Sequence, residues 1–121
     1  MSLSTDARKL HLATDTDLRQ LIFTHSHVLV KFVDEDCVIC KALAPKMTLL
    51  ANDARYTHVL FLQIDAAENP VAAKEVGFTS APFVAAYGHA RMLYCESVFS
   101  QEGVENILDN YLAPDEVRGV N

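Results

Sequence analysis

The four residues Cys37-Val38-Ile39-Cys40 lie between two segments of different character. Residues 27–33 form an apolar run that reads as a buried strand, and residues 41–52 have the pattern of a helix. Two thiols therefore lie where a strand passes into a helix N-terminus. The unpaired N–H groups and the positive dipole end of a helix favour a thiolate there, and they can lower a cysteine pKa from about 8.5 to roughly 3.5–7.5. This arrangement predicts dithiol chemistry at a strand-to-helix junction.

The spacing of the two cysteines indicates how they would act together. At the start of a helix, residues three positions apart lie on one face, close enough for two sulfurs to bridge. Cys37, the exposed N-terminal member, would attack a substrate disulfide, and Cys40 would then resolve the mixed disulfide. The same C-x-x-C spacing is half of a four-ligand zinc site, so metal binding stays open as an alternative.

A zinc or iron–sulfur site would need about four ligands. Beyond the motif, the candidates are one further cysteine and five scattered histidines: Cys95, His11, His25, His27, His58 and His89. Their spacing forms no second paired motif, so we expect no metal site in a single copy, although two copies could share their C-x-x-C motifs. Cys95 falls in a predicted strand, where a free cysteine usually fills apolar space.

Length and charge narrow the class of protein. The chain has 121 residues, of which 50% are hydrophobic, and this suits one domain over residues 1–121 with its core over about residues 8–113. The net charge of −6 without blocks of like charge argues against nucleic acid or a membrane surface as a partner. Residues 1–17 contain no apolar run of the kind found in secretory signals. We expect a cytoplasmic monomer.

The pattern along the chain predicts the order β-α-β-α-β-α-β-β-α, and hence a mixed sheet with helices on both faces. The expected strands cover residues 8–12, 28–33, 58–64, 83–87 and 91–98, and the expected helices cover residues 16–25, 41–52, 70–76 and 101–112. Capping is predicted from Thr14 or Asp15, from Asn69 and from Ser100. Pro45 should bend the second helix, and Gly88-His89 should form the hairpin turn.

Several motifs stand at a characteristic mutual spacing. They are the strand over residues 28–32, Cys37-x-x-Cys40-Lys41 followed by Pro45, Gln63-Ile64-Asp65 with Asn69-Pro70, residues 77–82 with Ala81-Pro82, and the closing hairpin and helix. Together these motifs resemble the thioredoxin family from about residue 9 to residue 112. The combination is far more specific than the C-x-x-C motif alone.

The resemblance implies a fold and a substrate-docking element. The fold would be α/β, a thioredoxin-like three-layer α/β/α sandwich whose mixed central sheet is flanked by four helices. Ala81-Pro82 would form a cis peptide bond beside the cysteines, and the backbone around Ala81 would dock the substrate in extended form.

The resemblance also implies an activity. The protein would be a thiol–disulfide oxidoreductase that acts on protein disulfides, with Cys37–Cys40 as a reversible redox-active disulfide and no bound cofactor. Electrons would come from a thioredoxin reductase, a flavin enzyme supplied with NADPH, or from another donor.

The residues around the cysteines depart from the family pattern Trp-Cys-Gly-Pro-Cys, because this chain has Asp36 before Cys37 and contains no tryptophan. Asp36, with Asp34 and Glu35 behind it, should oppose ionisation of Cys37. Lys41 places a cation directly after Cys40. Asp36 and Lys41 are therefore candidate residues for tuning the thiol pKa values.

Lys31 occupies the position at which the family has a buried aspartate beneath the second cysteine. Two interpretations stay open. The lysine reaches a polar edge and has no role in the chemistry, or it is buried beside Cys40 and tunes this thiol as a cation or as a neutral amine base.

An exposed apolar patch is predicted beside the cysteines, formed by Val38, Ile39, Ala81 and Val98, with Pro82 at the docking element. Ser97 stands where the family has a glycine that keeps the substrate groove open, so the groove should be slightly narrower. Such a patch is typical of partner binding and suits protein substrates.

A thioredoxin-like binding module without turnover is the second alternative. The altered residues around the motif favour it, since the family's Trp, Gly, Pro and buried Asp are all replaced. The two retained cysteines favour an oxidoreductase, because a pure adaptor has no chemical need for the pair.

Overall fold

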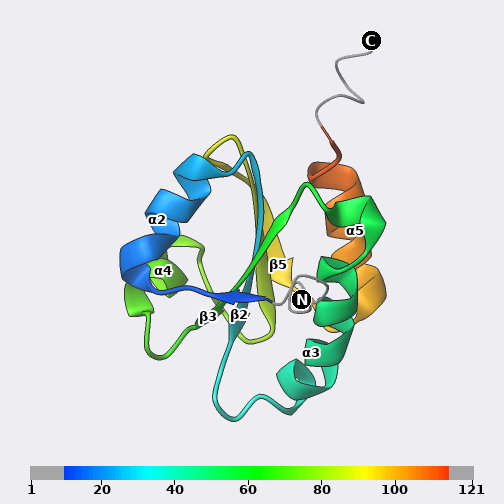
Figure 1. Ribbon diagram of the computed structural model, residues 1–121. Coiled ribbons are helices and arrows are strands. Elements are labelled where there is room, and N and C mark those ends of the chain that lie inside the picture. The colour runs from blue at the N-terminus through cyan, green and yellow to red at the C-terminus, as the bar shows by residue number, and fades with distance from the viewer. Residues whose placement is uncertain (1–9, 115–121) are drawn as a thin grey trace, which may run out of the picture.

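The computed structural model describes residues 10–114 and places a mixed five-stranded sheet between two pairs of helices (Figure 1). The strands are β1 (His11–Leu12), β2 (His27–Val33), β3 (Leu60–Asp65), β4 (Phe83–Gly88) and β5 (Arg91–Ser97). The helices are α2 (Asp15–Thr24), α3 (Val38–Ala51), α4 (Pro70–Glu75) and α5 (Gln101–Tyr111), with a short 3₁₀ helix η1 (Ala54–Tyr56). Helices α2 and α4 cover one face of the sheet, and α3 and α5 cover the other. The predicted three-layer sandwich with four flanking helices is confirmed.

Strand β2 occupies the centre of the sheet, whose order is β1-β3-β2-β4-β5. It pairs in parallel with β3 and antiparallel with β4, so that Lys31 lies between Gln63 and Val84. Its sequence is almost continuously apolar, as expected for a strand that is covered on both faces. The chain therefore leaves the middle of the sheet at Val33 and enters the segment that carries the cysteines.

The two faces of β2 contribute to two separate hydrophobic cores. Val28, Val30 and Phe32 belong to the core beneath α2 and α4, whereas Leu29 belongs to the core beneath α3 and α5. Because side chains alternate along a strand, Lys31 lies on the same face as Leu29. The sequence thus directs a lysine into the layer between the sheet and α3.

Helix α4 begins directly after Asn69, as predicted, but its capping hydrogen bonds come from another element. Asn69 precedes α4, but its side chain makes no capping bond to this helix. Its amide oxygen accepts the N–H of Asp15 at 2.8 Å, while the Asp15 carboxylate accepts the N–H groups of Val71 and Ala72 at 3.3 and 2.7 Å. Asn69 thus occupies the predicted N-cap position of α4, but the Asp15 carboxylate of α2 accepts the capping hydrogen bonds in its place.

Helix α3 begins at Val38 instead of Lys41, because the Cys37 sulfur occupies the N-cap position and accepts a backbone N–H of the first turn. The helix continues through Pro45, and the bend expected there stays a prediction. Strand β3 begins at Leu60 instead of His58, since η1 and the turn after it precede the strand.

The remaining differences concern the hairpin and the ends of the chain. His89 and Ala90 both have positive φ, at 52° and 69°, as a two-residue type I′ turn requires. The turn is therefore one residue later than predicted, because Gly88 still belongs to β4. The first strand covers only His11–Leu12 of the predicted residues 8–12, of which residues 8 and 9 lie outside the described residues. The ends of the expected domain, 1–121, also lie outside them.

Candidate active site

Cys37 and Cys40 form a disulfide at the N-terminus of α3, with their Cα atoms 5.2 Å apart. Cys37 is the N-cap residue and half-buried, whereas Cys40 lies in the first helical turn and is buried. The predicted placement of both sulfurs at a strand-to-helix junction is thus observed.

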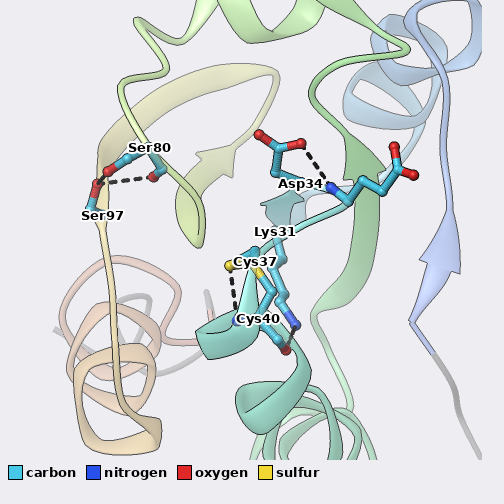
Figure 2. The surroundings of a disulfide bond; sticks show 7 residues. Lys31, Asp34, Cys37, Cys40, Ser80 and Ser97 are labelled. Atoms are coloured by element: carbon cyan, nitrogen blue, oxygen red, sulfur yellow. Dashed lines mark hydrogen bonds between the residues drawn. A yellow bond between two sulfur atoms is a disulfide. The ribbon is translucent and has the colours of Figure 1, made fainter.

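The Cys37 sulfur accepts the backbone N–H of Cys40 at 3.0 Å (Figure 2). A sulfur at this position also faces the positive end of the α3 dipole. Both interactions are stronger with a thiolate than with a thiol, so the reduced state favours negative charge on Cys37. Cys37 is therefore the member of the pair that is prepared for nucleophilic attack.

A groove of about 440 Å³ opens beside the disulfide. It is lined by the loop before α3, by the start of this helix and by the loop that precedes β4: Asp34, Asp36, Cys37, Val38, Ile39, Phe78, Thr79, Ser80 and Ala81. Val38 is 77% exposed, and Ile39 is 45% exposed. The Ala81–Pro82 peptide bond is cis, as the resemblance implies, and Pro82 itself is buried behind Ala81.

The chain matches the model of a known protein family. A family model described as Thioredoxin matches residues 9–107. The chain belongs to the thioredoxin family. A search of curated protein sequences found no match.

Solved structures of thioredoxins share this fold. Mitochondrial thioredoxin 3 from Saccharomyces cerevisiae, in its oxidised form, has a TM-score of 0.77 at 24% identity, and the alignment covers 84% of this chain and 94% of that one. Thioredoxin f from spinach chloroplast has a TM-score of 0.78 at 21% identity, with 90% and 96% covered. Fasciola hepatica thioredoxin has a TM-score of 0.77 at 23% identity, with 84% and 99% covered. At these identities the likeness shows the shared fold.

Lys31 of this thioredoxin-family chain lies beneath the disulfide. The residue is 0% exposed, and its Nζ atom donates a hydrogen bond to the backbone oxygen of Cys40 at 3.4 Å (Figure 2). Burial lowers the pKa of Lys31 from 10.5 to about 8. The Lys31 side chain is therefore buried beside Cys40, and its role in tuning this thiol stays a prediction.

The acidic segment between β2 and α3 is an ordered turn. The Asp34 carboxylate accepts the N–H of Glu35 at 2.7 Å, and the Asp34 backbone oxygen accepts the N–H of Cys37 at 3.2 Å. Asp36 lines the groove together with Cys37, whereas Lys41 lines a separate hollow behind Cys40. The two candidate tuning charges are thus placed on different sides of the disulfide, and both are exposed.

Val98 does not belong to the exposed patch that the sequence predicts. It is only 3% exposed and lies in the core beneath α3 and α5. Strand β5 ends at Ser97, and the N–H of Val98 bonds to the Pro82 oxygen at 3.0 Å. The side chain turns inward over Gly103, where an added Cβ would lie 2.8 Å from the Val98 Cγ1 atom.

Ser97 lies outside the residues that line the groove, yet it holds one of the groove walls. Its hydroxyl donates to the Ser80 backbone oxygen at 3.2 Å and lies 3.4 Å from the Ser80 hydroxyl (Figure 2). Phe78, Thr79 and Ser80 belong to the motif over residues 77–82 and also line the groove, a role that the sequence alone did not predict. Their position directly before Ala81-Pro82 was the available signal.

The third cysteine lies apart from the disulfide. Cys95 is half-buried, packs against the core beneath α2 and α4, and points its sulfur at the Val76 oxygen, 3.4 Å away. This is the apolar-filler position expected of it.

Three histidines meet at the opposite end of β2 from the cysteines, a cluster that the sequence analysis missed. The His27 ring lies 5.1 Å from that of His58 and 5.8 Å from that of His89. Within residues 10–114, no group of three or more His, Cys, Asp or Glu side chains has an arrangement that could hold a metal ion. No helix in the same range is long and apolar enough to cross a membrane.

Proposed function

We propose that this thioredoxin-family chain is a thiol–disulfide oxidoreductase that acts on protein disulfides through the reversible Cys37–Cys40 disulfide. The observation that carries the proposal is the disulfide at the N-terminus of α3, directly beside an exposed apolar groove. Family membership and a disulfide-forming cysteine pair support an oxidoreductase in general. The choice of protein disulfides as substrates rests on the groove.

The reaction proceeds in two exchanges. The Cys37 thiolate attacks one sulfur of the substrate disulfide, and the other substrate sulfur leaves as a thiolate. The Cys40 thiolate then attacks the Cys37 sulfur, the Cys37–Cys40 bond forms, and the bond between Cys37 and the substrate breaks. Two electrons pass from the dithiol to the substrate, which leaves as a dithiol after protonation by solvent.

The groove favours an extended polypeptide over a small polar disulfide. Val38 and Ile39 expose apolar side chains on one side, and the backbone around Ala81 lies on the other. An extended segment can bury its side chains against the first wall while its main chain meets the second. The burial of Val98 makes the apolar part of this surface smaller than the sequence predicted.

Turnover requires a donor that reduces the disulfide again. Members of the thioredoxin family act on protein disulfides and interact with reductases, so we propose a thioredoxin reductase or an equivalent donor as the second partner. No cofactor beyond the disulfide enters the two exchanges. We further propose that the protein works as a monomer in the cytoplasm, where a reducing environment keeps such a pair in turnover.

Reduction of insulin disulfides in the presence of dithiothreitol tests the proposal. The wild-type protein should accelerate the reaction, Cys37→Ser should abolish the acceleration, and Cys40→Ser should accumulate a mixed disulfide with the substrate. A wild-type rate equal to that of Cys37→Ser would overturn the oxidoreductase. Retained binding of peptides in the groove would then favour the binding module.

A further inference from the structure

Lys31 is one of the largest fully buried side chains in the part of the chain that the structure describes. It lies in the central strand, with Gln63 of β3 and Val84 of β4 as its neighbours in register. A lysine is almost never fully buried unless it is paired, because its charge loses the surrounding water. Its position therefore calls for a partner.

No carboxylate within residues 10–114 forms an ion pair with Lys31. Its hydrogen bond goes to a neutral acceptor, the backbone oxygen of Cys40, at 3.4 Å. In the disulfide state the cation thus has a hydrogen bond but no counter-charge. Reduction of the disulfide changes this, because Cys40, whose backbone oxygen accepts the hydrogen bond from Lys31, then has a thiol that can carry a negative charge.

A hollow of about 160 Å³ connects this place with solvent. Its lining includes Lys31, Gln63 and Val33 from the sheet, Cys40, Lys41 and Ala44 from α3, and Asp34 from the loop. The titratable groups that face it besides Lys31 are therefore Cys40, Lys41 and Asp34, since Gln63 and Val84 carry no charge. The hollow gives water a route by which a proton can reach or leave the lysine.

We propose that the Lys31 ammonium is the counter-ion of the Cys40 thiolate, so that it stabilises the reduced dithiol state relative to the disulfide. This inference rests on the proposed function and assigns Lys31 a role in it. Lys31 acts through Cys40 and does not touch the substrate.

The step begins when Cys37 is bound to the substrate in the mixed disulfide and Cys40 is a free thiol. The Cys40 thiol releases its proton through the hollow to water, which gives a thiolate beside the Lys31 ammonium. The thiolate attacks the Cys37 sulfur of the mixed disulfide, the Cys37–Cys40 bond forms, and the substrate thiolate leaves. The Lys31 ammonium has then lost its counter-charge and keeps its hydrogen bond to the backbone oxygen of Cys40.

The redox equilibrium with dithiothreitol at pH 7 tests the proposal, with alkylation of free thiols and mass spectrometry as the readout. Lys31→Met keeps the length of the side chain and removes the charge, so the equilibrium should move about tenfold toward the disulfide, which is about 30 mV for a two-electron couple. Lys31→Arg should stay close to wild type. Lys46→Met removes an exposed charge from α3, the helix that carries Cys40, and should leave the equilibrium unchanged.

A thiolate titration separates the charge effect from a structural one. In a Cys37→Ser/Cys95→Ser background, Cys40 is the remaining thiol of the three cysteines, and Lys31→Met should raise its pKa. An unchanged Cys40 pKa, or a redox equilibrium equal to that of wild type, would overturn the role of Lys31. Neither result changes the insulin assay of the wild-type protein, so the proposed function is tested independently of the role of Lys31.

Discussion

Asp15 at the start of α2 and Asn69 just before α4 connect the first turns of these two helices, because each side chain accepts hydrogen bonds from the start of the other helix. The Asp15 carboxylate accepts the N–H groups of Val71 and Ala72 in α4, and the Asn69 amide oxygen accepts the N–H of Asp15 in α2. Helix α4 has only 6 residues and is too short to be stable alone. A carboxylate at its N-terminus compensates both the unpaired N–H groups and the helix dipole.

We expect Asp15→Ala and Asn69→Ala each to lower the free energy of unfolding by about 1–2 kcal/mol, the usual cost of losing a helix cap. Because the two residues share one set of hydrogen bonds, the double variant should lose less than the sum of the single losses. Urea denaturation of the four proteins measures this coupling. Strictly additive losses would show that the two helix starts are stabilised independently.

The stability of the oxidised protein should rise between about pH 8 and pH 10. Burial lowers the pKa of Lys31 to about 8, whereas the unfolded chain keeps this proton up to about 10.5. In this pH range unfolding takes up a proton, so the free energy of unfolding rises by up to about 2–3 kcal/mol above its value at neutral pH.

Lys31→Met should remove most of this rise and should be more stable than wild type at pH 7, since it eliminates an unpaired buried charge. Urea midpoints of both proteins across this range provide the test. Measurements should stop near pH 10, because burial raises the pKa of Tyr87 to about 12, and its ionisation in the unfolded chain lowers stability above that point. Parallel pH profiles for the two proteins would contradict the assignment.

Asp36→Asn should increase the reactivity of Cys37. Asp36 lines the same groove as the Cys37 sulfur, and removing a neighbouring negative charge lowers the cost of forming the thiolate. The pH dependence of iodoacetamide alkylation should shift to lower pH. Glu102→Gln, an exposed change in the first turn of α5, is the matched control and should leave the profile in place.

The apolar wall of the groove should matter for large substrates only. Val38→Ser and Ile39→Ser remove exposed apolar surface without touching the cysteines, so kcat/KM for insulin should fall about fivefold, equivalent to about 1 kcal/mol of lost contact. Reduction of a small aromatic disulfide should change little. An equal loss for both substrates would place the effect on the cysteines instead of the groove.

Much of the fold follows from local patterns in the sequence. The apolar run in β2, the helical spacing in α2 and α5, and the serine before α5 determine where these elements form, because each depends on neighbouring residues. The pairing of Cys37 with Cys40 follows from their spacing at a helix start.

The errors arise where residues far apart in the sequence decide the outcome. Asn69 and Asp15 are 54 positions apart, and no local signal shows that they exchange caps. Val98 turns inward because β5 ends one residue earlier than predicted and a glycine in α5 leaves space for it. The depth of Lys31 likewise depends on α3 closing over it, which the sequence of β2 alone does not show.

Strand β2 is hydrogen-bonded to β3 on one side and to β4 on the other. Its last residue is followed directly by the acidic turn and the two cysteines. Because β2 is paired with a strand on each side, we expect it to keep its position when a substrate binds. The substrate then has to adapt its own conformation to the groove. We therefore expect a disulfide in a flexible, unfolded segment to be reduced faster than a disulfide inside a folded domain.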